Sequence, residues 1–114
     1  MPSVAQPRFH PVDLVANPRD FGRVEHPKLA ARPGLSRTER AWAILQHRAV
    51  FVAHEALAAA GMGLEDLAVE TGESPNWLRR KFTGRTPVNV GDLVGWAAVL
   101  GVDVWPVLGS ADLG

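Results

Sequence analysis

Apolar residues recur at helical spacing from residue 42 onward. One stripe with three- and four-residue spacing is formed by Trp42, Leu45, Ala49, Val52, Ala56 and Ala59. We expect this helix to begin after Ser36, because Ser36 and Glu39 have the spacing of a capping box. It is expected to end near Ala60, where two glycines follow within three residues. The pattern leaves open whether the helix is continuous or bends near its middle.

Four shorter helices are expected next, because N-caps and glycine stops divide the rest of the chain. They are expected to cover residues 64–71, 76–83, 89–100 and 104–108. Ser74 is the predicted cap of the second, with Pro75 at the first helical position, where a missing amide is tolerated. Asn89 and Asp92 have capping-box spacing at the start of the third. No segment reads as a strand, so the predicted fold class is all-α.

Residues 1–35 have a different pattern, in which prolines separate scattered large apolar side chains. Six of the nine prolines lie here, and each disfavours helix at the residue before it. Seven large apolar residues between Phe9 and Leu29 are more than a solvated tail requires. We therefore expect an irregular extended arm that packs on its own domain, on a twin subunit or on DNA, with protein favoured. The predicted organisation is an arm at 1–35, a helical domain at 36–108 and a tail at 109–114.

Composition narrows the class of protein. The chain of 114 residues has no cysteine, which excludes disulfides and thiolate metal sites. No apolar run is long enough to span a bilayer, and the start of the chain lacks a signal-peptide pattern. These features favour a cytoplasmic protein with no membrane partner.

Charge is unevenly distributed, although the formal net charge is zero. Residues 1–48 have a net charge of +4 and residues 49–114 a net charge of −4. All four bases of the acidic half lie between Arg79 and Arg85. This cluster favours a nucleic-acid partner, and the competing interpretation is a solvated helix end, since cations favour helix C-termini.

Residues 61–84 have the pattern of a helix-turn-helix core. Gly72 is expected to supply the positive φ of the turn, and Ala68 is small where the two helices cross. Leu78 returns to the interior four residues before Phe82. The large residues assigned to the core are Leu67, Leu78, Phe82, Trp42 and Trp96.

This segment resembles the XRE or lambda-repressor family, which includes phage repressors, Cro proteins and many antitoxins. The resemblance covers about half of the chain, needs no gap across residues 61–84 and continues through residues 89–108. It implies a five-helix lambda-repressor-like domain with a proline-rich N-terminal extension. It also implies a sequence-specific transcriptional regulator that binds double-stranded DNA as a homodimer on a two-fold symmetric operator.

The resemblance also implies which residues meet DNA. The start of the second helix of the motif faces the bases, where Arg reads guanine and Asn reads adenine through paired hydrogen bonds. The implied base contacts are Pro75, Asn76, Trp77 and Arg79, and the implied phosphate contacts are Arg80, Lys81, Thr83 and Arg85. For Trp77, packing against the arm or the first helix is the competing interpretation.

The last expected helix carries more apolar surface than one turn can bury. Its large side chains are Val104, Trp105 and Leu108, and we expect them to form the dimer interface.

Enzymatic chemistry is not indicated. His47 and His54 are seven residues apart, about 10 Å along a helix and too far for one zinc ion. There is no glycine-rich phosphate loop, and nothing places Ser, His and Asp together. We therefore expect no metal, no cofactor and no catalytic activity.

Departures from the family pattern leave an alternative function open. Leu64 stands where the family often has a phosphate-binding Gln, Glu73 where an apolar residue is usual, and Trp77 where a small polar residue is common. Glu65 and Asp66 add negative charge near the expected DNA backbone. The alternative is a protein-interaction adaptor, antitoxin-like or polymerase-binding, with weak or no DNA binding and a partner on the arm.

Overall fold

The computed structural model describes residues 9–101, which are mainly helical and contain no strand. Its elements are the 3-10 helices η1 (Pro11–Leu14) and η2 (Pro18–Asp20) and the helices α1 (Arg37–Ala60), α2 (Leu64–Thr71), α3 (Pro75–Phe82) and α4 (Val90–Leu100). The predicted all-α class is confirmed. The expected helix at 104–108 and the tail at 109–114 lie outside the described residues. Within residues 9–101, no helix combines the length and hydropathy needed to cross a membrane.

α1 is a single continuous helix of 24 residues. Its predicted capping box is present: Ser36 Oγ accepts from Glu39 N at 3.0 Å, and Glu39 Oε1 accepts from Ser36 N at 2.9 Å. Gly61 ends the helix at φ +66°, in the left-handed region that a residue without Cβ adopts freely.

The buried face of α1 is displaced around the helix from the predicted apolar stripe, of which only Ala49 is buried, and it includes polar side chains. Its buried residues are Ala43, Gln46, His47, Ala49, Val50, Ala53 and Leu57. Gln46 is buried because its amide nitrogen donates to Val88 O at 2.8 Å while its oxygen accepts from Val88 N. The other members of the predicted stripe are not buried: Trp42, Leu45, Val52 and Ala56 are half-buried and Ala59 is exposed. Apolar residues also lie on this second face, at Ala43, Val50, Ala53 and Leu57, so periodicity within the helix could not decide which face the other elements cover.

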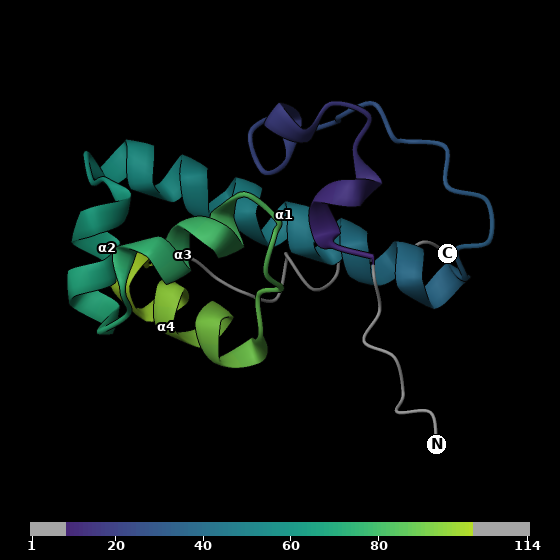
Figure 1. Ribbon diagram of the computed structural model, residues 1–114. Coiled ribbons are helices and arrows are strands. Elements are labelled where there is room, and N and C mark those ends of the chain that lie inside the picture. The colour runs from purple at the N-terminus through teal and green to yellow at the C-terminus, as the bar shows by residue number, and fades with distance from the viewer. Residues whose placement is uncertain (1–8, 102–114) are drawn as a thin grey trace, which may run out of the picture.

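The main core lies where α2, α3 and α4 pack beside the C-terminal half of α1 (Figure 1). Leu67, Leu78, Phe82 and Trp96 are all buried there, as predicted. The rings of Phe82 and Trp96 have centroids 4.8 Å apart. Trp42 is an exception: it is only half-buried and packs on Phe9, with ring centroids 6.0 Å apart, in a separate cluster.

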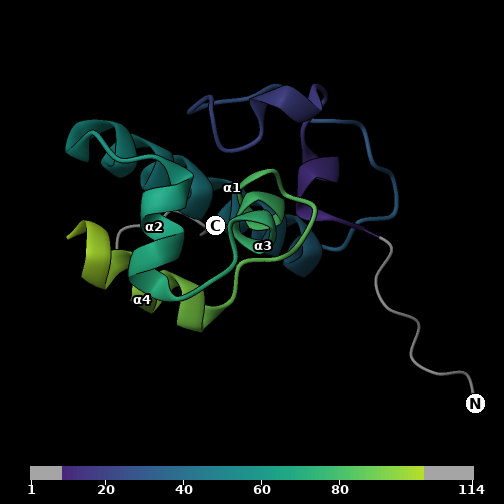
Figure 2. The same cartoon turned by 60° about the vertical axis from the view of Figure 1, so that its left-hand side comes forward.

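The described part of the arm packs on its own helical domain, which is one of the three alternatives. Phe9, Leu14, Val15 and Phe21 are buried, so the scattered apolar residues do have a packing role. The arm is less extended than predicted, because Pro11 and Pro18 each start a 3-10 helix. In both cartoon views this purple-to-blue segment lies beside α1 and close to the loop after α3 (Figures 1 and 2).

Hydrogen bonds fix the arm at two places. Gly22 N donates to His47 Nδ1, and His47 Nε2 lies 2.9 Å from Val24 O. Burial lowers the pKa of His47, which favours the neutral ring that can accept from Gly22. Val12 N donates to Gly84 O at 3.0 Å, directly after α3. Gly84 has φ +76°, and a Cβ there would lie 2.8 Å from Val12 N, so this close approach requires glycine.

Candidate nucleic-acid interface

α2 and α3 are joined by a tight turn with the predicted chemistry. Gly72 ends α2 at φ +77°. Ser74 Oγ accepts from Trp77 N at 3.1 Å, and Pro75 occupies the first position of α3. This cap satisfies one amide at the helix start that has no partner within the helix. The local sequence thus sets both where α3 begins and how it leaves the turn.

α3 buries one side and exposes the other. Leu78 and Phe82 are buried in the core and anchor the helix. The exposed residues on α3 and directly after it are Pro75, Asn76, Trp77, Arg79, Arg80, Thr83 and Arg85. Seven of the eight predicted DNA contacts therefore lie on the surface, which is the condition for any of them to reach a ligand.

Lys81 is the eighth, and its predicted phosphate contact is wrong. Its side chain is only 4% exposed, and its Nζ lies 2.6 Å from Asp92 Oδ1 and 2.9 Å from Glu73 Oε2. Burial disfavours the charged ammonium, but the hydrogen bonds to Asp92 and Glu73 outweigh burial and raise the pKa of Lys81. The ammonium is therefore held between two carboxylates of its own chain.

Two of the departures from the family pattern meet at Lys81. Glu73 is half-buried because it binds Lys81, and the exposed ring of Trp77 has its centroid 5.5 Å from Lys81 Nζ. That distance permits a cation–π contact. Helical periodicity could not reveal this cluster, because its members lie in the α2–α3 turn, on α3 and on α4.

Arg79 is exposed in the last turn of α3, one turn after Asn76. Its Nη1 donates to Asn76 Oδ1 at 2.8 Å, which draws together the two side chains best suited to read bases. Arg79 Nη2 also lies 3.9 Å from Glu65 Oε2 on α2. Both partners of this ion pair are at least half-exposed, so it stabilises the fold little and is easily exchanged for another anion.

A groove of about 810 Å³ lies beside the C-terminal end of α3, with the arm as its opposite wall. We call it the arm groove; the residues that line it are His10, Val12, Asp13, Pro18, Arg19, Phe21, Arg23, Arg80, Phe82, Thr83 and Arg85. It brings Arg19 and Arg23 of the arm beside the predicted phosphate contacts Arg80 and Arg85. The sequence did not single out Arg19 and Arg23, because the only signal for them was the excess of basic residues in the N-terminal segment.

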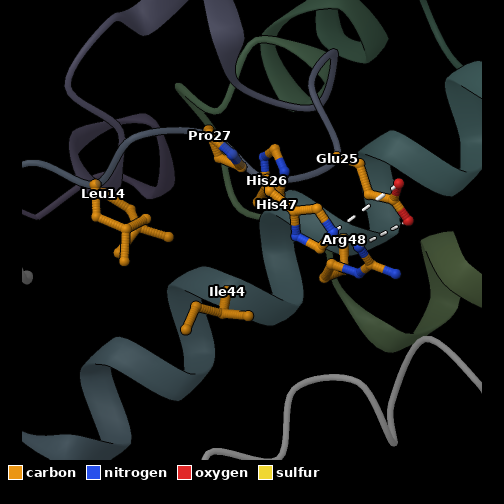
Figure 3. A pocket seen from close by; sticks show the side chains of 8 residues that line it. Leu14, Glu25, His26, Pro27, Ile44, His47 and Arg48 are labelled. Atoms are coloured by element: carbon orange, nitrogen blue, oxygen red, sulfur yellow. Dashed lines mark ion pairs between the residues drawn. The ribbon is translucent and has the colours of Figure 1, made fainter.

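A second hollow, of about 440 Å³, follows the seam between the arm and α1 (Figure 3). Glu25 faces Arg48 across it, with Oε2 4.0 Å from Arg48 Nη1, and its Oε1 lies equally far from His26 Nε2. Both ring nitrogens of His47 are engaged by arm backbone, so this side chain holds the arm and has no ring nitrogen free for a ligand. Among the described residues, no three His, Asp or Glu side chains are grouped to hold a metal ion.

The expected dimer contacts Val104, Trp105 and Leu108 lie outside the described residues. Comparison of the chain with protein-family models, curated proteins and solved structures finds no match.

Proposed function

We propose that this protein is a sequence-specific DNA-binding regulator with a lambda-repressor-like fold, in which α3 enters the major groove. The observation that carries the proposal is the division of α3 into an anchored face and a hydrogen-bonding face. Leu78 fixes the helix in the core, while Asn76 in the first turn and Arg79 one turn later project from its exposed side. Recognition helices read base edges with exposed side chains, mainly those of their N-terminal part, where Asn76 lies.

In this proposal some exposed residues of α3 contact bases and others contact phosphates. Asn76 and Arg79 hydrogen-bond to base edges, with Pro75 and Trp77 in contact beside them. Arg80, Thr83 and Arg85 contact phosphates and set the position of the helix along the duplex. Dimerisation through Val104, Trp105 and Leu108 then presents two copies of α3 to a two-fold related operator. Sedimentation of the wild type and of Trp105→Ala tests that assembly, which is expected to shift toward monomer in the variant.

The exposed face of α2 favours a second candidate function, the protein-interaction adaptor. Glu65, Asp66 and Glu70 are exposed there, and Val69 between them is 80% exposed. An acidic surface repels phosphate, whereas it complements a basic protein surface. A contact through α2 is also compatible with DNA binding through α3.

Selection of bound duplexes from a random pool tests the proposal. The wild type is expected to enrich a short defined sequence, and Arg79→Ala is expected to lose the preference at one base pair. A wild-type protein that enriches no sequence and is not retained on calf-thymus DNA at low salt would show that the proposal is wrong. The adaptor function would then be the better interpretation.

A further inference from the structure

We infer that the arm groove binds phosphates of the DNA backbone beside α3, with Arg19 and Arg23 of the arm as contacts. The inference rests on the proposed DNA binding and extends the protein's footprint from α3 onto the arm. It assigns a DNA-binding role to a segment for which the sequence favoured packing on protein.

The charge of the groove supports an anionic ligand. Arg19, Arg23, Arg80 and Arg85 line it, and among residues 9–101 none of these four has a carboxylate within ion-pairing distance. The one acidic residue in the lining, Asp13, has its Oδ2 3.7 Å from Arg32 Nη2. Gathering four like charges costs free energy, which an anion in the groove would offset.

The position of the groove favours duplex DNA over a small anion. Arg80 and Thr83 belong both to the exposed side of α3 and to the lining, so the groove continues the candidate interface without a break. Small-molecule sites are mostly apolar and enclose their ligand. An open groove lined by arginines instead suits a linear polyanion that passes the C-terminal end of a recognition helix.

The arm presents its arginines from a folded segment. Phe21, which lies between Arg19 and Arg23 in the sequence, is buried against the core. Val12 N is bonded to Gly84 O at the end of α3. Arg19 and Arg23 therefore require less ordering on binding than they would on a loose tail, and this preserves affinity.

The test is the double variant Arg19→Gln/Arg23→Gln, with the affinity for the selected duplex and for a scrambled duplex measured between 50 and 200 mM salt. Loss of two phosphate contacts is expected to reduce the slope of log affinity against log salt by about 2. Over this fourfold range of salt, the wild type then loses about tenfold more affinity than the variant. Preference for the selected duplex should stay at the wild-type value, because phosphates carry no base identity.

The matched control is Lys28→Gln/Arg37→Gln, which removes the same charge from exposed residues outside the groove. It is expected to keep the wild-type slope. Arg19→Lys/Arg23→Lys retains the charge and should keep most of the slope, with an unchanged urea midpoint as the check on folding. A wild-type slope in Arg19→Gln/Arg23→Gln, or an equal decrease in the control, would overturn the inference.

The outcomes also separate the groove from the proposed function. If the wild type shows sequence preference but its salt slope is unchanged in Arg19→Gln/Arg23→Gln, only the inference about the arm groove is overturned. If the salt slope falls in Arg19→Gln/Arg23→Gln but base preference is intact in Arg79→Ala, the arm groove is supported. The proposed reading of bases by α3 is then overturned. A wild type that binds no DNA overturns both. Loss of affinity for a polyglutamate peptide, with DNA binding unchanged, would assign the groove to an acidic protein and also overturn the inference.

Discussion

Lys81 Nζ lies 2.6 Å from Asp92 Oδ1, so a charge pair joins the end of α3 to the start of α4. The other carboxylate oxygen of Asp92 accepts from Asn89 N at 2.9 Å and closes the capping box of α4. One side chain thus caps α4 and neutralises a buried ammonium on the neighbouring helix. The packing of α3 against α4 therefore depends on a specific polar contact as well as on the apolar core.

Removing this ammonium should destabilise the protein. Lys81→Met leaves Asp92 and Glu73 without their partner, and breaking a buried pair costs on the order of 3 kcal/mol. Urea unfolding measures the free energy. Lys81→Met/Asp92→Asn removes the buried carboxylate while keeping an oxygen to accept from Asn89 N, so it should recover part of the loss. An unchanged midpoint in Lys81→Met would show that the pair does not stabilise the fold.

Arg79→Ala should weaken binding to the selected duplex by ~1–3 kcal/mol and relax preference at one base pair. The reason is loss of a paired hydrogen bond to a base rather than loss of charge alone. Titration against every single-base variant of the site measures the preference. Arg37→Ala, an equal change in charge on the exposed start of α1, is the control. Unaltered preference in Arg79→Ala would mean that α3 does not read the sequence.

Leu78→Ala should cost on the order of 2–5 kcal/mol, because Leu78 is fully buried and its removal leaves a cavity. Val69→Ala shortens an exposed side chain on the adjacent helix and should change the free energy of unfolding by less than about 0.5 kcal/mol. Equal midpoints for the two variants would be inconsistent with α3 anchored through Leu78.

Gly84→Ala should release the arm, since φ is +76° at this position and a Cβ would lie 2.8 Å from Val12 N. Gly72→Ala is a matched control: its φ is +77°, but no atom lies within 4 Å of the added Cβ. Both variants incur backbone strain, so the difference between them reports the collision with the arm. Limited proteolysis should cut within residues 9–30 faster in Gly84→Ala. Identical cleavage of the two variants would argue against docking at Gly84.

Acid should destabilise the fold through His54. Burial, followed by the positive charge of Arg23, lowers the pKa of His54 to about 4, and its Nε2 is buried without a hydrogen-bond partner among the described residues. Between the ordinary pKa of about 6.5 and this value, the unfolded chain binds more protons than the folded chain. Stability is then full above pH ~6.5 and falls as the pH drops toward 4.

The urea midpoint measured from pH 7.5 to 4.5 tests this dependence. His54→Phe removes the titrating ring and keeps an aromatic side chain against Phe82, whose ring centroid lies 4.9 Å from that of His54. The variant is expected to lose less stability between pH 6.5 and 4.5 than the wild type. The same pH slope in both proteins would assign the titration to another group, of which His47 is the first to test.

Sequence alone determined, to within a residue, where the four described α-helices begin and end. Ser36, Ser74 and Asn89 each accept from the amide three residues later, and such caps are legible because donor and acceptor lie within one turn. The apolar anchor of α3 was legible for the same reason, since spacing within one helix places Leu78 and Phe82 on one face.

Tertiary structure decided the contacts between residues on different elements, which the spacing of residues within one helix cannot predict. Lys81 looks like one more exposed base in the sequence, yet carboxylates from the turn before α3 and from α4 draw it inward. Arg19 and Arg23 join Arg80 only because the arm folds back over α1 and docks at Gly84. Charges and hydrogen bonds act between groups that are close in space, so pairs on separate elements become visible only once those elements are packed together.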